Sequence, residues 1–116
     1  MMVRINSFIE EGSFAYVFPG QGAQYVGMGQ QLYNGSDSAK SVLDQIDKVL
    51  NRPLTKLMFN GPEDELRQTF NAQPAIMAVS LACIMAMTEQ LGLDSLPPPK
   101  FVAGHSLGEY TALSIS

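Results

Sequence analysis

The chain has 116 residues, of which 46% are apolar and 16% are charged, and this composition is that of one folded domain rather than a disordered tail. Seven basic and eleven acidic residues give a net charge of −4, and no run of Lys or Arg occurs, so we do not expect nucleic acid as a partner. One histidine and one cysteine, Cys83, are too few for a zinc site or an internal disulfide, and no metal is expected.

The N-terminal residues 1–12 mix charged and apolar side chains and lack the hydrophobic stretch of a signal peptide, so we expect them to form an N-terminal extension. The longest apolar segment, residues 74–87, is interrupted by Ser80 and is too short to cross a bilayer. The sequence therefore predicts a soluble, cytoplasmic protein that does not bind a membrane.

The first predicted element is a strand over residues 13–18, because its aromatic and β-branched residues show no polar alternation, a pattern typical of a buried strand. Pro19 and Gly20 end this strand. A glycine-rich loop over residues 20–24 follows, and a short helix is expected over residues 28–33.

Residues 34–37, Asn-Gly-Ser-Asp, have the chemistry of a turn and a helix N-cap. The helix that they introduce is expected over residues 38–50, where apolar residues recur on one face at helical spacing. Asp44, Asp47 and Lys48 fall on the opposite face, and we expect them to be exposed to solvent without a further role.

Three more helices are expected before the second strand. One covers residues 53–59, and the next covers residues 62–71 with proline as its first helical residue. The third, residues 73–91, is apolar on all sides until its last turn, so we expect it to be buried on all sides, with Cys83 in the core. Gly92 is a typical helix stop.

A proline-rich connector at residues 96–100 leads to a second strand at residues 101–103 and a helix over residues 106–116. Strands that alternate with helices indicate the α/β class. A sheet of two strands is marginal by itself, so we expect exposed apolar patches and a tendency of the chain to associate.

Between this strand and helix stands Gly104-His105-Ser106-Leu107-Gly108, a G-x-S-x-G pattern. A serine at the tip of a sharp strand-to-helix turn brings the residues two positions away so close together that only residues without a Cβ fit easily. The turn exposes the Ser106 hydroxyl, and the N–H groups that begin the helix point to where an oxyanion would form. The pattern predicts Ser106 as a nucleophile, and an ordinary glycine-rich turn is the alternative.

The loop at residues 18–24, Phe-Pro-Gly-Gln-Gly-Ala-Gln, does not match a dinucleotide fingerprint, because Tyr25 stands where the third glycine would be. It is not a P-loop either, since no Gly-Lys-Ser/Thr follows. Open α/β sheets bind ligands at the carboxyl ends of their strands. We therefore expect this loop to present a backbone N–H to a carbonyl oxygen held over Ser106.

Four motifs follow one another along the chain: Phe18-Pro19-Gly20-Gln21-Gly22-Ala23-Gln24, Gly27-Met28-Gly29, Gln73-Pro74-Ala75 and Gly104-His105-Ser106-Leu107-Gly108-Glu109-Tyr110. In this order the sequence resembles the malonyl-CoA:acyl-carrier-protein transacylase family and the related acyltransferase domains of fatty-acid and polyketide synthases. The resemblance implies a partial three-layer, parallel-sheet α/β acyltransferase domain with a strand–elbow–helix nucleophile turn. Residues 13–116 would be the N-terminal part of its large domain, incomplete at the C-terminus, with the remainder and the small ferredoxin-like subdomain absent.

The resemblance also implies acyl transfer in fatty-acid biosynthesis, with malonyl-CoA as substrate, acyl carrier protein as partner and no cofactor. Ser106 would take the malonyl group from coenzyme A as an ester and pass it to the phosphopantetheine thiol of the carrier. The backbone N–H groups of Gln21 and Leu107 correspond to those that hold the oxyanion in this family. Gln73 corresponds to a glutamine near the active site, for which a helix N-cap is the alternative interpretation.

The family's general-base histidine and its malonate-binding arginine both follow the nucleophile, and no residue of this chain corresponds to either. His105 adjoins Ser106, but adjacent residues leaving a strand point to opposite sides, so we expect His105 to pack or to support the loop. A serine without a base is a weak nucleophile. We therefore expect a fragment that is weakly active or inactive alone. The alternatives are an α/β-hydrolase-type serine esterase and a non-catalytic truncated piece.

Overall fold

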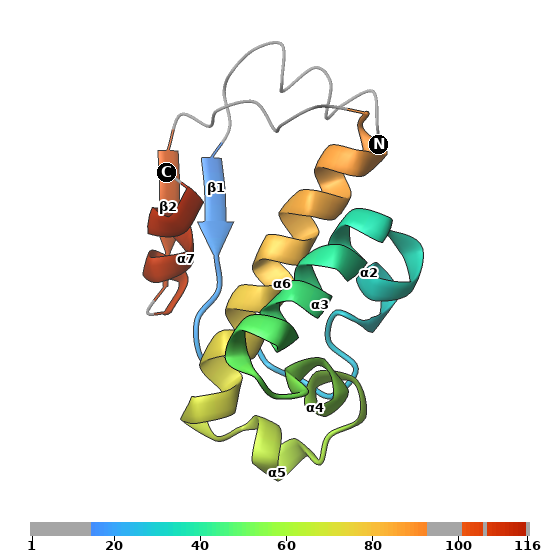
Figure 1. Ribbon diagram of the computed structural model, residues 1–116. Coiled ribbons are helices and arrows are strands. Elements are labelled where there is room, and N and C mark those ends of the chain that lie inside the picture. The colour runs from blue at the N-terminus through green and yellow to red at the C-terminus, as the bar shows by residue number, and fades with distance from the viewer. Residues whose placement is uncertain (1–14, 93–100, 106, 116) are drawn as a thin grey trace.

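The computed structural model describes residues 15–92, 101–105 and 107–115, so the predicted extension at 1–12 and the connector at 96–100 lie outside the described residues. The described residues form two short strands and six helices, five of which lie between the strands in sequence. Figure 1 shows their arrangement. In chain order they are β1 (Ala15–Phe18), α2 (Gln30–Gly35), α3 (Asp37–Leu50), α4 (Leu54–Asn60), α5 (Glu63–Leu66), α6 (Thr69–Gln90), β2 (Phe101–Gly104) and α7 (Leu107–Ile115).

Strands β1 and β2 pair in parallel, with Ala15 opposite Phe101 and Phe18 opposite Gly104. Helices α2 to α6 form the long connection that a parallel pair requires. Helix α7 packs against both strands, and the three form one side of the molecule in Figure 1. The predicted α/β class is confirmed, and the carboxyl ends of the two strands meet at one edge of the sheet.

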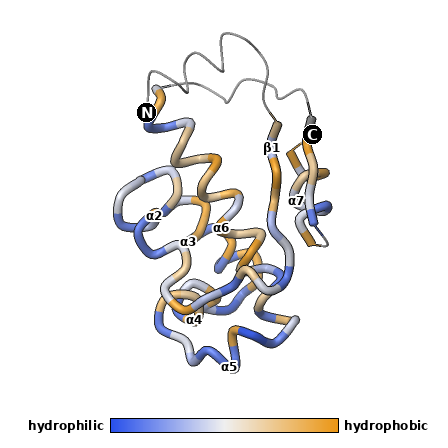
Figure 2. Tube along the Cα trace, turned by 180° about the vertical axis from the view of Figure 1, so that it is seen from behind, coloured by the Kyte–Doolittle hydropathy of each residue, from blue (hydrophilic) through white to orange (hydrophobic). Residues whose placement is uncertain are grey.

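The hydrophobic core lies mainly between α3, α4 and α6, and α3 makes the most extensive contact with α6. Four alanines of α6 are fully or almost fully buried, and their small side chains let the neighbouring helix approach closely. Figure 2 shows hydrophobic residues along β1, while the segment around α5 is largely hydrophilic. The largest fully buried side chains of this core are Leu43, Leu54, Met58, Leu66 and Ile76.

Helix α3 begins as the sequence predicts. The hydroxyl of Ser36, its N-cap, accepts a hydrogen bond from the Ala39 amide at 3.1 Å. The same hydroxyl donates to the carboxylate of Glu89 on α6, so the cap also joins the two helices. The helix ends before Asn51, whose φ of 54° lies in the left-handed region.

The acidic residues of α3 do more than face solvent, and that part of the prediction is wrong. Asp47 accepts a hydrogen bond from the Thr55 amide at 3.0 Å, and its other carboxylate oxygen accepts one from the Thr55 hydroxyl. Helix α4 lacks a side-chain cap of its own, because Pro53 stands at its N-cap. Asp47 therefore caps α4 from the preceding helix, and Asp44 accepts a hydrogen bond from the Tyr33 hydroxyl at 2.8 Å.

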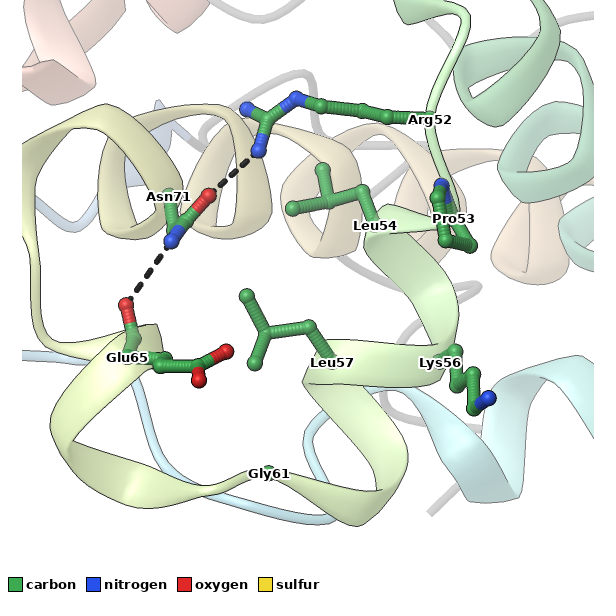
Figure 3. A pocket seen from close by; sticks show the side chains of 8 residues that line it. All are labelled: Arg52, Pro53, Leu54, Lys56, Leu57, Gly61, Glu65 and Asn71. Carbon is green, nitrogen blue, oxygen red and sulfur yellow. Dashed lines mark hydrogen bonds between the residues drawn. The ribbon is translucent and has the colours of Figure 1, made fainter.

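The predicted helix over residues 62–71 is also wrong, because α5 stops at Leu66 and α6 begins at Thr69. Figure 3 shows the side chains that hold this junction. Asn71, which is buried, donates to the Glu65 carbonyl at 2.9 Å and accepts a hydrogen bond from Arg52, and Arg52 also donates to the Phe70 carbonyl at 3.0 Å. Side-chain hydrogen bonds thus stabilise the break between α5 and α6, which the helical periodicity of the sequence does not predict.

Helix α6 is only partly covered, although its composition predicts burial on all sides. Four of its five alanines are buried, but Phe70 is 72% exposed, and Met85 and Met87 are exposed as well. With 22 residues, α6 is longer than the predicted apolar segment, and it has the length and composition of a membrane span. Its packing against α3, α4 and α7 instead makes it the central helix of the fold, and it ends before Gly92 as predicted, with φ of +68°.

Strand β1 is also more exposed than its sequence suggests. Only Phe18 is buried, and Val17 is 75% exposed. Within the described residues, β1 has β2 as its single neighbouring strand.

Candidate active site

The candidate nucleophile follows the carboxyl end of β2. Only His105 and Ser106 separate Gly104, the last residue of the strand, from Leu107, the first residue of α7. The His105 amide donates to the Phe18 carbonyl at 3.1 Å, and the Gly108 amide donates to the His105 carbonyl at 2.9 Å. The predicted sharp strand-to-helix turn is therefore present, although Ser106 itself lies outside the described residues.

Two glycines make this turn sterically possible. A Cβ on Gly104 would lie 2.0 Å from the carbonyl carbon of Gly108. A Cβ on Gly108 would lie 2.1 Å from the carbonyl oxygen of Phe18 and 2.9 Å from that of Pro19. Real Cβ atoms essentially never approach this closely, so neither position has room for a side chain. The turn is packed backbone against backbone, and it is packed in the same way against the first loop.

The first loop turns sharply after β1. The Ala23 amide donates to the Gly20 carbonyl at 3.2 Å, and Gly22, with φ of +107°, occupies a conformation that favours glycine. The Gly22 amide donates to the side-chain oxygen of Gln24 at 2.8 Å. The amides of Gly20, Gln21 and Gln24 have no acceptor among the described residues, so the Gln21 amide is able to bind a ligand.

The turn between β2 and α7 also has a backbone amide without an acceptor. Leu107 is the first residue of α7, and its amide also has no acceptor among the residues that the structure describes. The close approach of Gly108 to Phe18 brings the two loops together at the carboxyl edge of the parallel strands. Oxyanion holes are commonly built from two such free backbone N–H groups, and the assignment of this role to Gln21 and Leu107 stays a prediction.

Gln73 lies within α6 and is exposed. The N-cap of this helix is Gln68, so the alternative interpretation of Gln73 as an N-cap is wrong. Its role as an active-site contact stays a prediction.

Sequence reasoning did not find Thr69, the first residue of α6, whose hydroxyl accepts a hydrogen bond from the Gln21 side chain at 3.0 Å. These two residues are 48 positions apart, and no local pattern marks the pair.

The His105 side chain is exposed, while its backbone makes two of the hydrogen bonds that shape the turn. His105 therefore supports the loop through its main chain. In the ranges 15–92, 101–105 and 107–115, no three His, Cys, Asp or Glu side chains are grouped so that they could hold a metal ion.

The fold and the site define the class of this protein as an α/β protein built around a serine elbow. Residues 15–116 match the acyl transferase domain, and the chain belongs to this family. The match agrees with the acyltransferase interpretation of the motifs and not with an α/β-hydrolase-type esterase.

The similar proteins found by sequence and by structure are both described as malonyl transferases that involve acyl carrier protein. The chain is 46% identical over 99 residues to the malonyl CoA-acyl carrier protein transacylase of Bacillus subtilis (strain 168), covering 85% of this chain and 30% of that protein. The crystal structure of an acyl-carrier-protein S-malonyltransferase from Bartonella henselae matches with a TM-score of 0.80 and 50% identity, over 87% of this chain and 32% of that one. The chain thus spans about 30% of the length of the curated relative.

A third similar structure includes a protein partner. It is a malonyl-transacylase solved in complex with its type II polyketide synthase acyl-carrier protein, with a TM-score of 0.75 and 40% identity over 87% of this chain and 31% of that chain.

Proposed function

We propose that this chain carries the nucleophile and the oxyanion-binding loops of a cytoplasmic malonyl-CoA:acyl-carrier-protein transacylase of fatty-acid biosynthesis. One observation carries the proposal. The serine turn and the loop after β1 are in direct backbone contact at Gly108 and Phe18, and each loop has a free amide, that of Leu107 and that of Gln21. This arrangement supports attack by a serine on a carbonyl whose oxygen lies between the two amides.

The transfer follows two steps. The Ser106 oxygen attacks the thioester carbonyl of malonyl-CoA, the amides of Gln21 and Leu107 stabilise the oxyanion, and the C–S bond breaks to release coenzyme A and leave a malonyl ester. The phosphopantetheine thiol of the carrier protein then attacks the ester carbonyl, the acyl C–O bond breaks, and the proton lost by the thiol returns to the Ser106 oxygen, which restores the hydroxyl. The serine proton must pass to a base in the first step, and no base is assigned, because the single histidine of the sequence is His105.

The substrates are inferred from the relatives. Both the Bacillus subtilis protein and the Bartonella henselae structure are named for malonyl transfer involving acyl carrier protein, and a third relative was solved with its carrier protein bound. Identities of 40% to 50% along most of this chain support the same substrate pair here.

The test is malonylation of the chain by malonyl-CoA, followed by peptide mass spectrometry, with Ser106→Ala as the control. We expect a slow, stoichiometric adduct on Ser106, because an oxyanion hole without a base still accelerates acyl transfer by about 10³-fold over water. Added carrier protein should remove the adduct faster than water does. An adduct elsewhere, no adduct after prolonged incubation at high malonyl-CoA, or preferential hydrolysis would contradict the proposal. Rapid labelling would show that the expectation of weak activity is wrong.

A further inference from the structure

The loop that bears the Gln21 amide is joined to α6 by a side-chain hydrogen bond. The Gln21 Nε2 atom donates to the Thr69 Oγ1 atom at 3.0 Å, and both side chains are exposed. The bond connects two segments that are 48 residues apart, one following β1 and one at the first residue of α6. It therefore links the candidate oxyanion donor to the helical part of the molecule.

Among the described residues, the other hydrogen bonds at the tip of the loop do not connect it to a helix. The bond from Ala23 to Gly20 and that from Gly22 to Gln24 are internal, so they shape the turn without fixing its position. Farther along, the Gly27 amide donates to the Met58 carbonyl on α4 at 2.7 Å, and this fixes where the segment leaves the site. Between Phe18 and Gly27, the Thr69 hydroxyl is the contact that holds Gln21 against α6.

Thr69 is itself held in a rigid setting. The amides of Asn71 and Ala72 donate to the Gln68 carbonyl at 2.8 and 2.7 Å. Arg52 donates to both the Asn71 side chain and the Phe70 carbonyl, as part of the junction drawn in Figure 3. An acceptor on the first residue of this braced helix has a defined position, so it can restrict the rotation of the Gln21 residue.

We propose that Thr69 is a positioning residue of the acyl transfer, which holds the Gln21 backbone amide in place through the Gln21 side chain. The inference rests on the proposed function, because the amide matters only if an oxyanion forms beside it. An oxyanion donor contributes about 10²- to 10³-fold in rate, and it acts only when it is held at hydrogen-bond distance. A displaced donor loses part of this factor, while the binding of malonyl-CoA does not depend on it.

The test compares Thr69→Val, which removes the acceptor at nearly constant shape, with Thr69→Ser, which retains it. We expect Thr69→Val to slow malonylation of Ser106 by about three- to tenfold with an unchanged half-saturating concentration of malonyl-CoA, and Thr69→Ser to stay within about twofold of the wild type. Thr88→Val is the matched control on the same helix, because the Thr88 hydroxyl bonds to the Ile84 carbonyl of its own helix.

A double-mutant cycle with Gln21→Ala isolates the bond. If the two side chains act through one hydrogen bond, the double variant is no slower than the slower single variant, whereas additive losses overturn the proposal. An unchanged rate in Thr69→Val, or an equal loss in Thr88→Val, overturns it as well.

Hydrogen exchange of the Gly22 and Ala23 amides, which are hydrogen-bonded within the loop, supplies a readout that does not need activity. Loss of the bond should speed exchange in Thr69→Val and Gln21→Ala but not in Thr69→Ser or Thr88→Val. Equal exchange in all variants overturns the positioning role. If exchange changes as expected while Ser106 is never malonylated, the hydrogen bond holds the loop and the proposed function fails, so the two failures are distinguishable.

Discussion

A methyl group on Gly108 would collide with the main chain of Phe18 and Pro19, neither of which can move away as a flexible side chain would. We therefore expect Gly108→Ala to lower the free energy of unfolding by about 3 kcal/mol or to separate the two loops. Urea denaturation monitored by circular dichroism measures the first effect, and exchange of the His105 amide, which donates to the Phe18 carbonyl, measures the second.

Gly35→Ala is the matched control for this substitution. Gly35 ends α2, and a Cβ there would meet nothing within 4 Å. We expect the free energy of unfolding of the Gly35→Ala variant to equal that of the wild type or to exceed it by up to about 1 kcal/mol. If both variants lose the same stability, the steric explanation of the elbow glycine is wrong.

Cys83 is a second residue whose behaviour follows from its surroundings. The prediction that Cys83 lies in the core is wrong, because this residue of α6 is only partly buried. Its partial burial still raises the pKa of the thiol above the ordinary value of 9.0, because the thiolate would lose solvation. Near pH 8 the folded chain should therefore hold less thiolate than the unfolded chain and react more slowly with iodoacetamide. The thiol favours folding while it is protonated, so this contribution should diminish as the pH rises above about 9.

The measurement is the alkylation rate of the single cysteine at several pH values, in buffer and in concentrated urea. Equal rates in the two conditions at pH 8 would contradict the expected shift.

At the scale of the elements, the helices cap one another across turns. Asp47 of α3 satisfies the Thr55 amide at the start of α4, where Pro53 offers no side-chain cap. Loss of a helix cap costs about 1 kcal/mol, up to about 2 kcal/mol in folded proteins. We expect Asp47→Ala to lower the free energy of unfolding by that amount, measured by urea denaturation.

Thr55→Val separates the contribution of the Thr55 hydroxyl bond to Asp47 from that of the Thr55 amide bond. The valine variant keeps the backbone amide bond and loses the hydroxyl bond, so we expect it to cost less than Asp47→Ala. In the double variant the two losses should not add, because the same carboxylate accepts both hydrogen bonds. Additive losses would show that Asp47 acts through something other than Thr55.

The helices with regular apolar spacing were predictable from sequence, and the breaks between them were not. Helix α3 differs from its predicted range by one residue, since the apolar face and the Ser36 cap are both local signals. The break between α5 and α6 depends on Arg52 and Asn71, whose hydrogen bond spans 19 residues. Composition likewise overstated the burial of α6, because it shows that a helix is apolar on all sides but not whether neighbours cover every side.

For the whole molecule, the described residues form a helical part around α3 and α6 and a smaller part made of β1, β2 and α7. The smaller part exposes apolar side chains, with Val17 75% and Tyr110 68% exposed. This agrees with the sequence-based expectation of exposed apolar patches, while the expected association of chains stays a prediction.

The position of the candidate site in the sequence was predictable, but the side-chain hydrogen bond that joins its first loop to α6 was not. The spacing of Gly104 and Gly108 around a serine anticipates the sharp turn, because sterics alone demand glycine there. The resemblance of the motifs to a known family named Gln21 and Leu107. Nothing in the sequence pointed to the role of Thr69, since a single hydrogen bond between distant residues leaves no periodic signal.

The carbonyl oxygen of Phe18 accepts the His105 amide and also adjoins the α-carbon of Gly108. Gln21 lies three residues beyond that carbonyl in sequence, and Leu107 immediately precedes Gly108. The two segments that carry the candidate donors therefore meet at a single carbonyl group of the main chain, that of Phe18. We therefore expect the two loops to stay joined at the Phe18 carbonyl even in a variant that loses the bond from Gln21 to Thr69.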